Sequence, residues 1–157
     1  MTRRIAFVAF TVCIATLMLG VFAVPGGAAT KDPCKVLKKS EVAQAFGATT
    51  VGNPKKGLGT AVSAQCAFSI TGGAAGDGTL TVNVMTTGAA AAYKGLPELG
   101  DYVPVAGYPK SLWSAKLSVV DVLKGSALLG VQGGFPDNTT DIQSQLVGLS
   151  KIGVKRV

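Results

Sequence analysis

Two stretches in the middle of the chain alternate apolar and polar residues, which is the pattern of β-strands. In residues 79–87 the apolar Leu80, Val82 and Val84 alternate with Thr79, Thr81 and Asn83, and residues 65–70 repeat this pattern. Because successive side chains of a strand point to opposite faces, each stretch predicts a strand with one buried and one solvated face. Residues 48–70 as a whole predict two short strands around a basic turn, the second of which includes 65–70. Four of the eight residues in 71–78 are glycine, which predicts a hairpin connection.

A meander of further strands is expected downstream of this hairpin. Its first strand lies at residues 102–105 or around Trp113, its second at 116–123 and its third at 126–131. Gly125 falls between the last two strands, where glycine supplies the positive φ of a tight turn.

Helical segments are expected near both ends of the folded region. Asp32 followed by Pro33 is typical of a helix start, and a second short helix at 41–46 meets Gly47, which can end it in a left-handed conformation. The mostly alanine segment 88–93 predicts another short helix. A C-terminal helix follows from four apolar residues spaced 4, 3 and 3 positions apart, Ile142, Leu146, Leu149 and Ile152. The fold class is therefore α+β: a mostly antiparallel sheet of about five to six strands, with a short N-terminal helical segment and a C-terminal helix packed on it.

The first residues of the chain have the three parts of a secretory signal peptide. Arg3 and Arg4 precede an apolar run at residues 5–24, and small residues with one proline fill 25–29. We expect cleavage after Ala29, which divides the chain into a signal peptide, 1–29, and one exported domain, 30–157. The alternative is a retained membrane anchor, since about 20 apolar residues can cross a bilayer. After cleavage, no transmembrane helix is expected.

The exported domain is moderately basic, with 13 Lys and Arg against 8 Asp and Glu and a net charge of +5. Much of the positive charge lies near its start. A surface of this kind can favour an anionic lipid, a cell-wall polymer or nucleic acid, although an ordinary solvated face is more typical of this composition. The partners expected are an envelope lipid, a polymer or a protein. Nucleic acid is not the expected partner, because no aromatic residue is interleaved with those lysines.

The cysteines predict one disulfide bond. Cys13 lies in the segment expected to be removed, so that Cys34 and Cys66 remain in the exported domain. An oxidising compartment favours their pairing, and the localisation expected is secreted or in the cell envelope. Lipid attachment at Cys34 is disfavoured, because the charged residues Lys31 and Asp32 precede it where a lipobox has small and apolar residues.

Several short motifs occur in a fixed order along the chain: Pro33-Cys34, Ser40-Glu41-Val42, the cysteine-aromatic strand "QCAF", "LGDY" at 99–102, "LKGSALLGV" and a basic terminal helix. This order resembles a family of actinobacterial secreted proteins and lipoproteins of unknown function. The resemblance covers about residues 32–156. It implies a cell-envelope location and a disulfide between Cys34 and Cys66, but it implies no reaction. Many members look lipid-anchored, whereas this chain lacks a lipobox.

Catalytic chemistry is poorly represented in the sequence. The chain has no histidine, which removes the common zinc sites and the usual general base, and its carboxylates are scattered. Glu98 and Asp101 are the closest approach to an acid–base pair. We therefore expect no catalytic residue, no metal site and no cofactor. Asn138 begins a glycosylation acceptor triplet, a pattern that often occurs by chance.

Three aromatic residues near the predicted meander, Tyr102, Tyr108 and Trp113, are candidates for a binding surface, although a place in the core is more typical of such residues. The function expected is that of a non-enzymatic exported cell-envelope protein that binds a small ligand, a lipid or a protein. The alternative is a carboxylate-dependent hydrolase of the envelope that uses Glu98 and Asp101.

Overall fold

The computed structural model describes residues 31–136 and 142–157, and the predicted signal peptide and the Asn138 triplet lie outside these ranges. The described chain begins with a short 3-10 helix, η1 (Pro33–Lys35), in which the Asp32 side chain accepts a hydrogen bond from the Cys34 amide. Helix α1 (Lys39–Phe46) follows, and Gly47 ends it at a φ of 60°. The start at Asp32 and Pro33 and the end at Gly47 confirm the sequence prediction, whereas α1 begins at Lys39, two residues before the predicted range 41–46.

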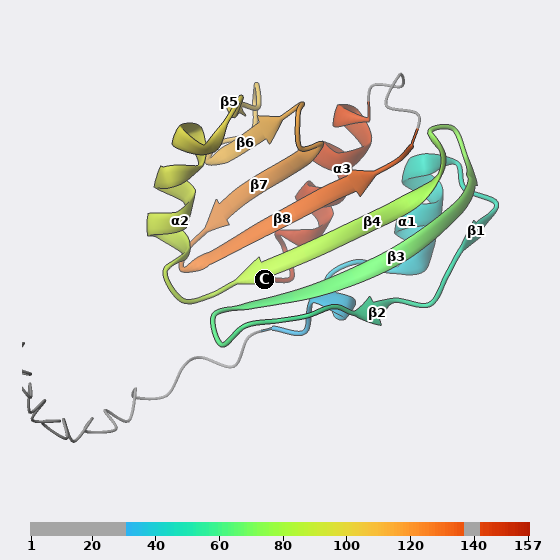
Figure 1. Ribbon diagram of the computed structural model, residues 1–157, viewed down its shortest axis with the longest axis horizontal. Helices are drawn as coiled ribbons and strands as arrows, with labels where there is room; N and C mark the ends of the chain where they lie inside the picture. Colours follow the sequence, from blue (N-terminus) through green and yellow to red (C-terminus); the bar gives the residue numbers. More distant parts are fainter. Residues whose placement is uncertain (1–30, 137–141) are drawn as a thin grey trace, which may run out of the picture.

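A single antiparallel sheet forms the centre of the described structure (Figure 1). Its strand order is β1-β3-β4-β8-β7-β6-β5, with β2 also paired to β3. The bounds are β1 (Thr50–Val51), β2 (Lys55–Lys56), β3 (Ser63–Gly73), β4 (Gly76–Met85), β5 (Val103–Pro104), β6 (Ser111–Ser114), β7 (Val119–Lys124) and β8 (Ala127–Gly134).

The sheet confirms the antiparallel α+β class but is larger than the predicted five to six strands, since the described residues contribute eight. Strands β1, β2 and β5 contain two residues each. Two residues cannot display an alternation, so the sequence pattern that predicts strands detects only the longer ones.

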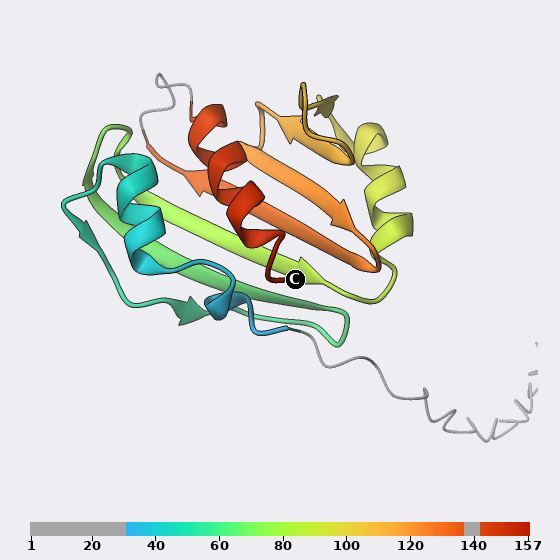
Figure 2. The same cartoon turned by 180° about the vertical axis from the view of Figure 1, so that it is seen from behind.

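Helices α1 and α3 (Gln143–Gly153) cover one face of the sheet, as Figure 2 shows. Helix α2 (Ala89–Gly95), continued by the 3-10 helix η2 (Leu96–Leu99), lies on the other side near β7 and β8 (Figure 1). This second side is otherwise uncovered by helices, and we call it the open face. Among the residues that the structure describes, no helix combines the length and the apolar character that spanning a bilayer requires.

The core lies between the sheet and helices α1 and α3. The alternation along β4 sends Leu80, Val82 and Val84 into it with no measurable exposure. Their polar neighbours Thr81 and Asn83 therefore face the open side. Along each of the longer strands, side chains likewise alternate between the core and the open face. Residues paired across two antiparallel strands project to the same face.

A disulfide bond joins the N-terminal segment to this core. Cys34, in η1, is bonded to Cys66 on β3, with their Cα atoms 5.2 Å apart. The prediction of this pair is confirmed. The bond is compatible with an extracytoplasmic location.

The two covering helices are also linked by an ion pair. Arg156, just beyond α3, donates to both carboxylate oxygens of Glu41 on α1, at 2.6 and 2.8 Å, and to the Val36 carbonyl oxygen at 2.8 Å. The Arg156 hydrogen bonds hold the pKa of Glu41 at about 2, well below its ordinary value. The basic C-terminal residues therefore fix α3 against α1.

Candidate functional site

A row of paired residues crosses the open face and brings a carboxylate over a glycine. Asn83 on β4 is opposite Gly130 on β8, and Gly130 is opposite Asp121 on β7. A Cβ atom added at Gly130 would lie 2.8 Å from Asp121 Oδ1 and 3.5 Å from Asn83 Cβ. Any larger residue at position 130 would push the carboxylate away, so the glycine makes room for it.

This row forms part of the lining of a hollow of about 210 Å³ on the open face. Strands β4, β7 and β8 supply several lining residues, while Leu96 of η2, Tyr102 and Leu117 come from the segments that border those strands. The complete lining is Thr81, Asn83, Leu96, Tyr102, Leu117, Val119, Asp121, Gly130 and Gln132. A smaller hollow of about 90 Å³ adjoins it and shares Asn83, Asp121 and Gly130.

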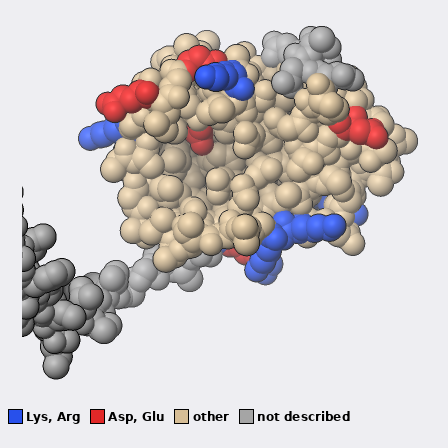
Figure 3. All heavy atoms as spheres, in the orientation of Figure 1, with Lys and Arg blue, Asp and Glu red and all other residues tan. Residues whose placement is uncertain are grey.

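The open face carries few charges. Figure 3 shows lysine and arginine mainly around the edges of the molecule in this view, whereas a small group of acidic atoms is recessed within the face itself. Asp121 is the only charged residue in the lining of the main hollow described above. Apart from the Asp121 carboxylate, the lining of the hollow is therefore uncharged and partly apolar.

Asp121 is buried, with 8 % of its surface exposed. Burial raises its pKa to about 6, although a hydrogen bond with Tyr102 acts in the opposite direction. Burial, followed by the nearby Asp121 charge, raises the pKa of Tyr102 to about 12, and the same two causes raise the pKa of Tyr93 on α2. No lysine or arginine of the described chain lines the hollow to compensate the carboxylate.

The three predicted aromatic residues do not share one surface. Tyr102 lines the hollow. Trp113 is opposite Val120, is 9 % exposed and belongs to the core beneath the helices. Tyr108 packs against this core, with Lys151 Nζ 5.4 Å from the centre of its ring. Only Tyr102 therefore contributes to the candidate site.

The two carboxylates proposed for acid–base chemistry have different surroundings. Asp101 accepts hydrogen bonds from the Ser114 hydroxyl at 2.5 Å and from the Lys116 amide at 2.9 Å. The bond from Ser114 is the main cause that lowers the pKa of Asp101. Glu98 is exposed on η2. Asp101 thus holds the turn between β6 and β7.

Sequence reasoning did not single out Asp121, Asn83 or Gly130. One signal was present: Asp121 interrupts the apolar run of residues 119–123. A charged residue inside a strand with apolar neighbours on both sides is seldom buried without a function or a partner. The place of Asn83 and Gly130 beside it depends on strand register, which the sequence pattern does not give.

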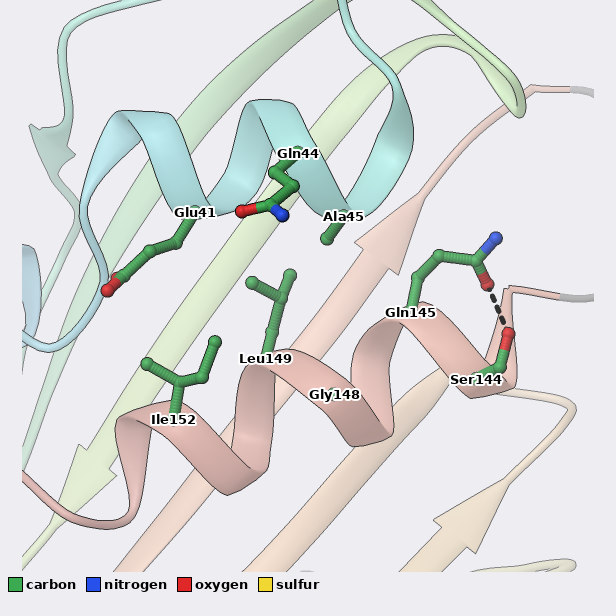
Figure 4. Close-up of a pocket in the computed structure, with 8 residues that line it drawn as sticks. All are labelled: Glu41, Gln44, Ala45, Ser144, Gln145, Gly148, Leu149 and Ile152. Carbon is green, nitrogen blue, oxygen red and sulfur yellow. Dashed lines mark hydrogen bonds between the residues drawn. The ribbon is translucent and has the colours of Figure 1, made fainter.

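A larger groove of about 480 Å³ lies between α1 and α3 on the opposite side of the sheet. Figure 4 shows Gln44 and Ala45 of α1 facing Leu149 and Ile152 of α3 across it. Glu41, at one end of the groove, forms an ion pair with Arg156, and the Ser144 hydroxyl donates a hydrogen bond to Gln145 Oε1 at 2.9 Å. The polar groups of the groove are thus largely paired within the protein, and the hollow is the stronger candidate.

Metal binding receives no support from the described residues, which contain no group of three or more His, Cys, Asp or Glu placed to hold an ion. Comparisons of this chain with protein-family models, curated proteins and solved structures find no match.

Proposed function

We propose that this chain is an exported binding module of the cell envelope and that its ligand occupies the hollow on the open face. The observation that carries the proposal is the buried carboxylate of Asp121, which lies in an accessible hollow that no lysine or arginine of residues 31–136 and 142–157 lines. The Cys34–Cys66 disulfide supports a location outside the cytosol.

The contrast with Glu41 favours a ligand over a purely structural role for Asp121. Glu41 is partly buried and has Arg156 as a partner, so its charged form is favoured and its pKa falls to about 2. Asp121 is more deeply buried, and its pKa moves the other way, to about 6. Burying an uncompensated charge opposes folding. A ligand that completes the site supplies a reason for its presence.

The side chains around Asp121 suit the recognition of a small polar group. Thr81, Asn83, Tyr102 and Gln132 offer hydroxyl and amide groups that can donate or accept hydrogen bonds. Apolar side chains complete the walls. A concave site that combines apolar walls with a few convergent polar groups is typical of small-ligand binding.

The proposal is tested with two substitutions on one strand. Thr81 lines the hollow, while Thr79, two residues earlier on the same face of β4, is exposed and does not line it. Amide chemical shifts of the ¹⁵N-labelled protein are followed while small water-soluble cations, anions and alcohols are added. We expect shifts at β4, β7 and β8 that Thr81→Phe abolishes and Thr79→Phe preserves. Equal responses of the two variants, or no response to any compound, would overturn the proposal.

A second candidate function, a carboxylate-dependent hydrolase, is favoured by one observation. A carboxyl group with a pKa of about 6, as Asp121 has, can act as a general acid near neutral pH. In this form of the hypothesis Asp121 takes the role first assigned to Glu98 and Asp101. Chromogenic esters and glycosides provide the assay: turnover that Asp121→Asn removes would support hydrolysis, and turnover that survives this substitution would exclude Asp121 as the acid.

A further inference from the structure

We propose that the hollow binds a protonated primary alkylamine, with the ammonium group at Asp121 and the alkyl chain along the apolar wall. This inference rests on the proposed function, because it names the chemical class of the ligand for the same site.

The charge of the ligand follows from the charge of the hollow. Asp121 is the only charged residue among the lining residues of the described chain, and it is buried. An anion would meet an uncompensated carboxylate, and a neutral ligand would leave it unpaired. A cation compensates the charge in a site of low solvent access, where ion pairing is stronger than in water.

The hydrogen-bonding groups favour an ammonium ion over a bulky cation. A primary ammonium carries three N–H donors on a small head. Beside Asp121, the hollow offers the side-chain oxygens of Thr81, Asn83 and Tyr102 as acceptors. A trimethylated ammonium has no N–H donor and could form no hydrogen bond to these oxygens.

The apolar part of the ligand follows from the wall of the hollow. Leu96, Leu117 and Val119 supply its apolar side chains. Leu117 is 43 % exposed, so it gives the hollow an apolar surface that a hydrocarbon chain can cover. A volume of about 210 Å³ limits the enclosed part to a short chain.

Binding of an amine is expected to depend on pH through Asp121. The titratable groups that interact with Asp121 are Tyr102, beside β5, and Tyr93 on α2, and burial keeps both phenols neutral in the neutral range. Asn83 on β4, Gly130 on β8 and Leu112 on β6, its neighbours across the sheet, carry no charge. With a pKa of about 6, Asp121 loses most of its charge by pH 5, and the affinity for an amine should fall by about tenfold between pH 7.5 and pH 5.

The experiment compares three probes of equal chain length: n-butylamine, 1-butanol and butyrate. Each is titrated into the ¹⁵N-labelled protein, residues 30–157 with the disulfide intact, at pH 7.5, and the amide shifts of β4, β7 and β8 give the dissociation constant. We expect n-butylamine to bind at least tenfold more tightly than 1-butanol and butyrate to bind most weakly. Asp121→Asn should remove the preference for the amine.

Glu98→Gln is the matched control, because it removes one negative charge from η2, the element that supplies Leu96 to the hollow, while Glu98 itself is exposed. It should leave the preference for the amine unchanged. A preference that survives Asp121→Asn, or that Glu98→Gln abolishes, would refute the inference and assign the effect to general electrostatics.

The outcomes also separate this inference from the proposed function. If 1-butanol or butyrate shifts the amides of the hollow as strongly as n-butylamine does, the hollow is a ligand site but not an ammonium site. If no probe shifts these amides, both hypotheses fail.

Two further probes distinguish the sources of an ammonium group. Stronger binding of 1,4-diaminobutane than of n-butylamine indicates a soluble polyamine. Binding to phosphatidylethanolamine vesicles but not to phosphatidylcholine vesicles indicates a lipid headgroup, because only the former presents N–H donors. Either result supports the ammonium assignment.

Discussion

Replacing Asp121 by asparagine should stabilise the protein at neutral pH and lose this advantage in acid. The substitution keeps the shape of the side chain and its place over Gly130, and it removes the charge that burial opposes. Because the pKa of Asp121 is raised by burial, the folded state binds a proton more tightly than the unfolded state does. The wild-type protein therefore loses stability as the pH rises from the unfolded-state pKa through the folded-state pKa.

The size of the effect follows from these two pKa values. The ordinary value is 3.8 and the folded-state value is about 6, a difference worth about 3 kcal/mol in the free energy of unfolding. The asparagine variant has no such dependence. The difference in unfolding free energy between variant and wild type should thus rise by about 3 kcal/mol between pH 3.5 and pH 7.5, most of it between pH 3.8 and pH 6.

Urea unfolding at a series of pH values measures this difference. The chain contains one tryptophan, Trp113, which is 9 % exposed and so reports unfolding by its fluorescence. Glu98→Gln serves as the control for loss of an exposed carboxylate and should change stability by less than about 0.5 kcal/mol throughout. If the difference in unfolding free energy between Asp121→Asn and wild type does not change with pH, the carboxylate is not desolvated. The argument that its charge is buried without compensation would then fail.

Three other substitutions or treatments test the packing of the fold. Glu41→Gln should lower the free energy of unfolding by about 1.5–3 kcal/mol at pH 7, measured in the same urea assay. Because the pKa of Glu41 is lowered from 4.5 to about 2 in the folded state, this loss should shrink as the pH falls through that window. Gly153→Ala should destabilise the protein by about 1–3 kcal/mol, because the new Cβ would lie 2.9 Å from a methyl group of Val36 in the core. Gly148→Ala, on the exposed side of the same helix, should instead stabilise it by about 0.5–1 kcal/mol. Equal thermal unfolding midpoints for the two variants would contradict this packing. Reduction of the Cys34–Cys66 disulfide should lower stability by about 3–4 kcal/mol, as measured by urea unfolding with and without reductant, and an unchanged unfolding midpoint would rule this out.

The longer elements could be predicted because their local pattern and their packing agree. The alternation in residues 79–87 matches β4, and the apolar stripe that begins at Ile142 matches α3, whose buried residues include Leu146 and Leu149. The disulfide was predicted because only Cys34 and Cys66 lie outside the predicted signal peptide. The prediction placed the first strand of the meander at 102–105 or around Trp113, whereas the sheet has a strand at each place, β5 and β6. It also left out β2, which lies between β1 and β3 in the sequence, where a basic turn was predicted. The two-residue strands β1, β2 and β5 exist through pairing with longer neighbours and have no alternation of their own.

The site was less predictable than the fold, since its residues come from separate strands and meet through register. Tyr102 was predicted as a binding residue because it is an aromatic residue close in sequence to other aromatic residues, and not because of its place beside Asp121. Trp113, in the same sequence neighbourhood, projects to the opposite face because it pairs with Val120 and not with Asp121. The aromatic residues were grouped because they lie close in sequence. Since adjacent positions on a strand point to opposite faces, closeness in sequence does not show which face a side chain occupies.

The register of one hairpin links the stability of the core to the existence of the hollow. Strands β7 and β8 are joined by a tight turn in which Lys124 pairs with Ala127 and Gly125 adopts a φ of 58°. A slip of one residue in β7 would turn Val120 to the open face and place Asp121 under the helices, among apolar side chains. Such a slip is opposed by the burial of Val120 and by the positive φ of the turn. The forces that bury the valine thus place the carboxylate in the hollow, so the fold maintains there a charge that itself opposes folding.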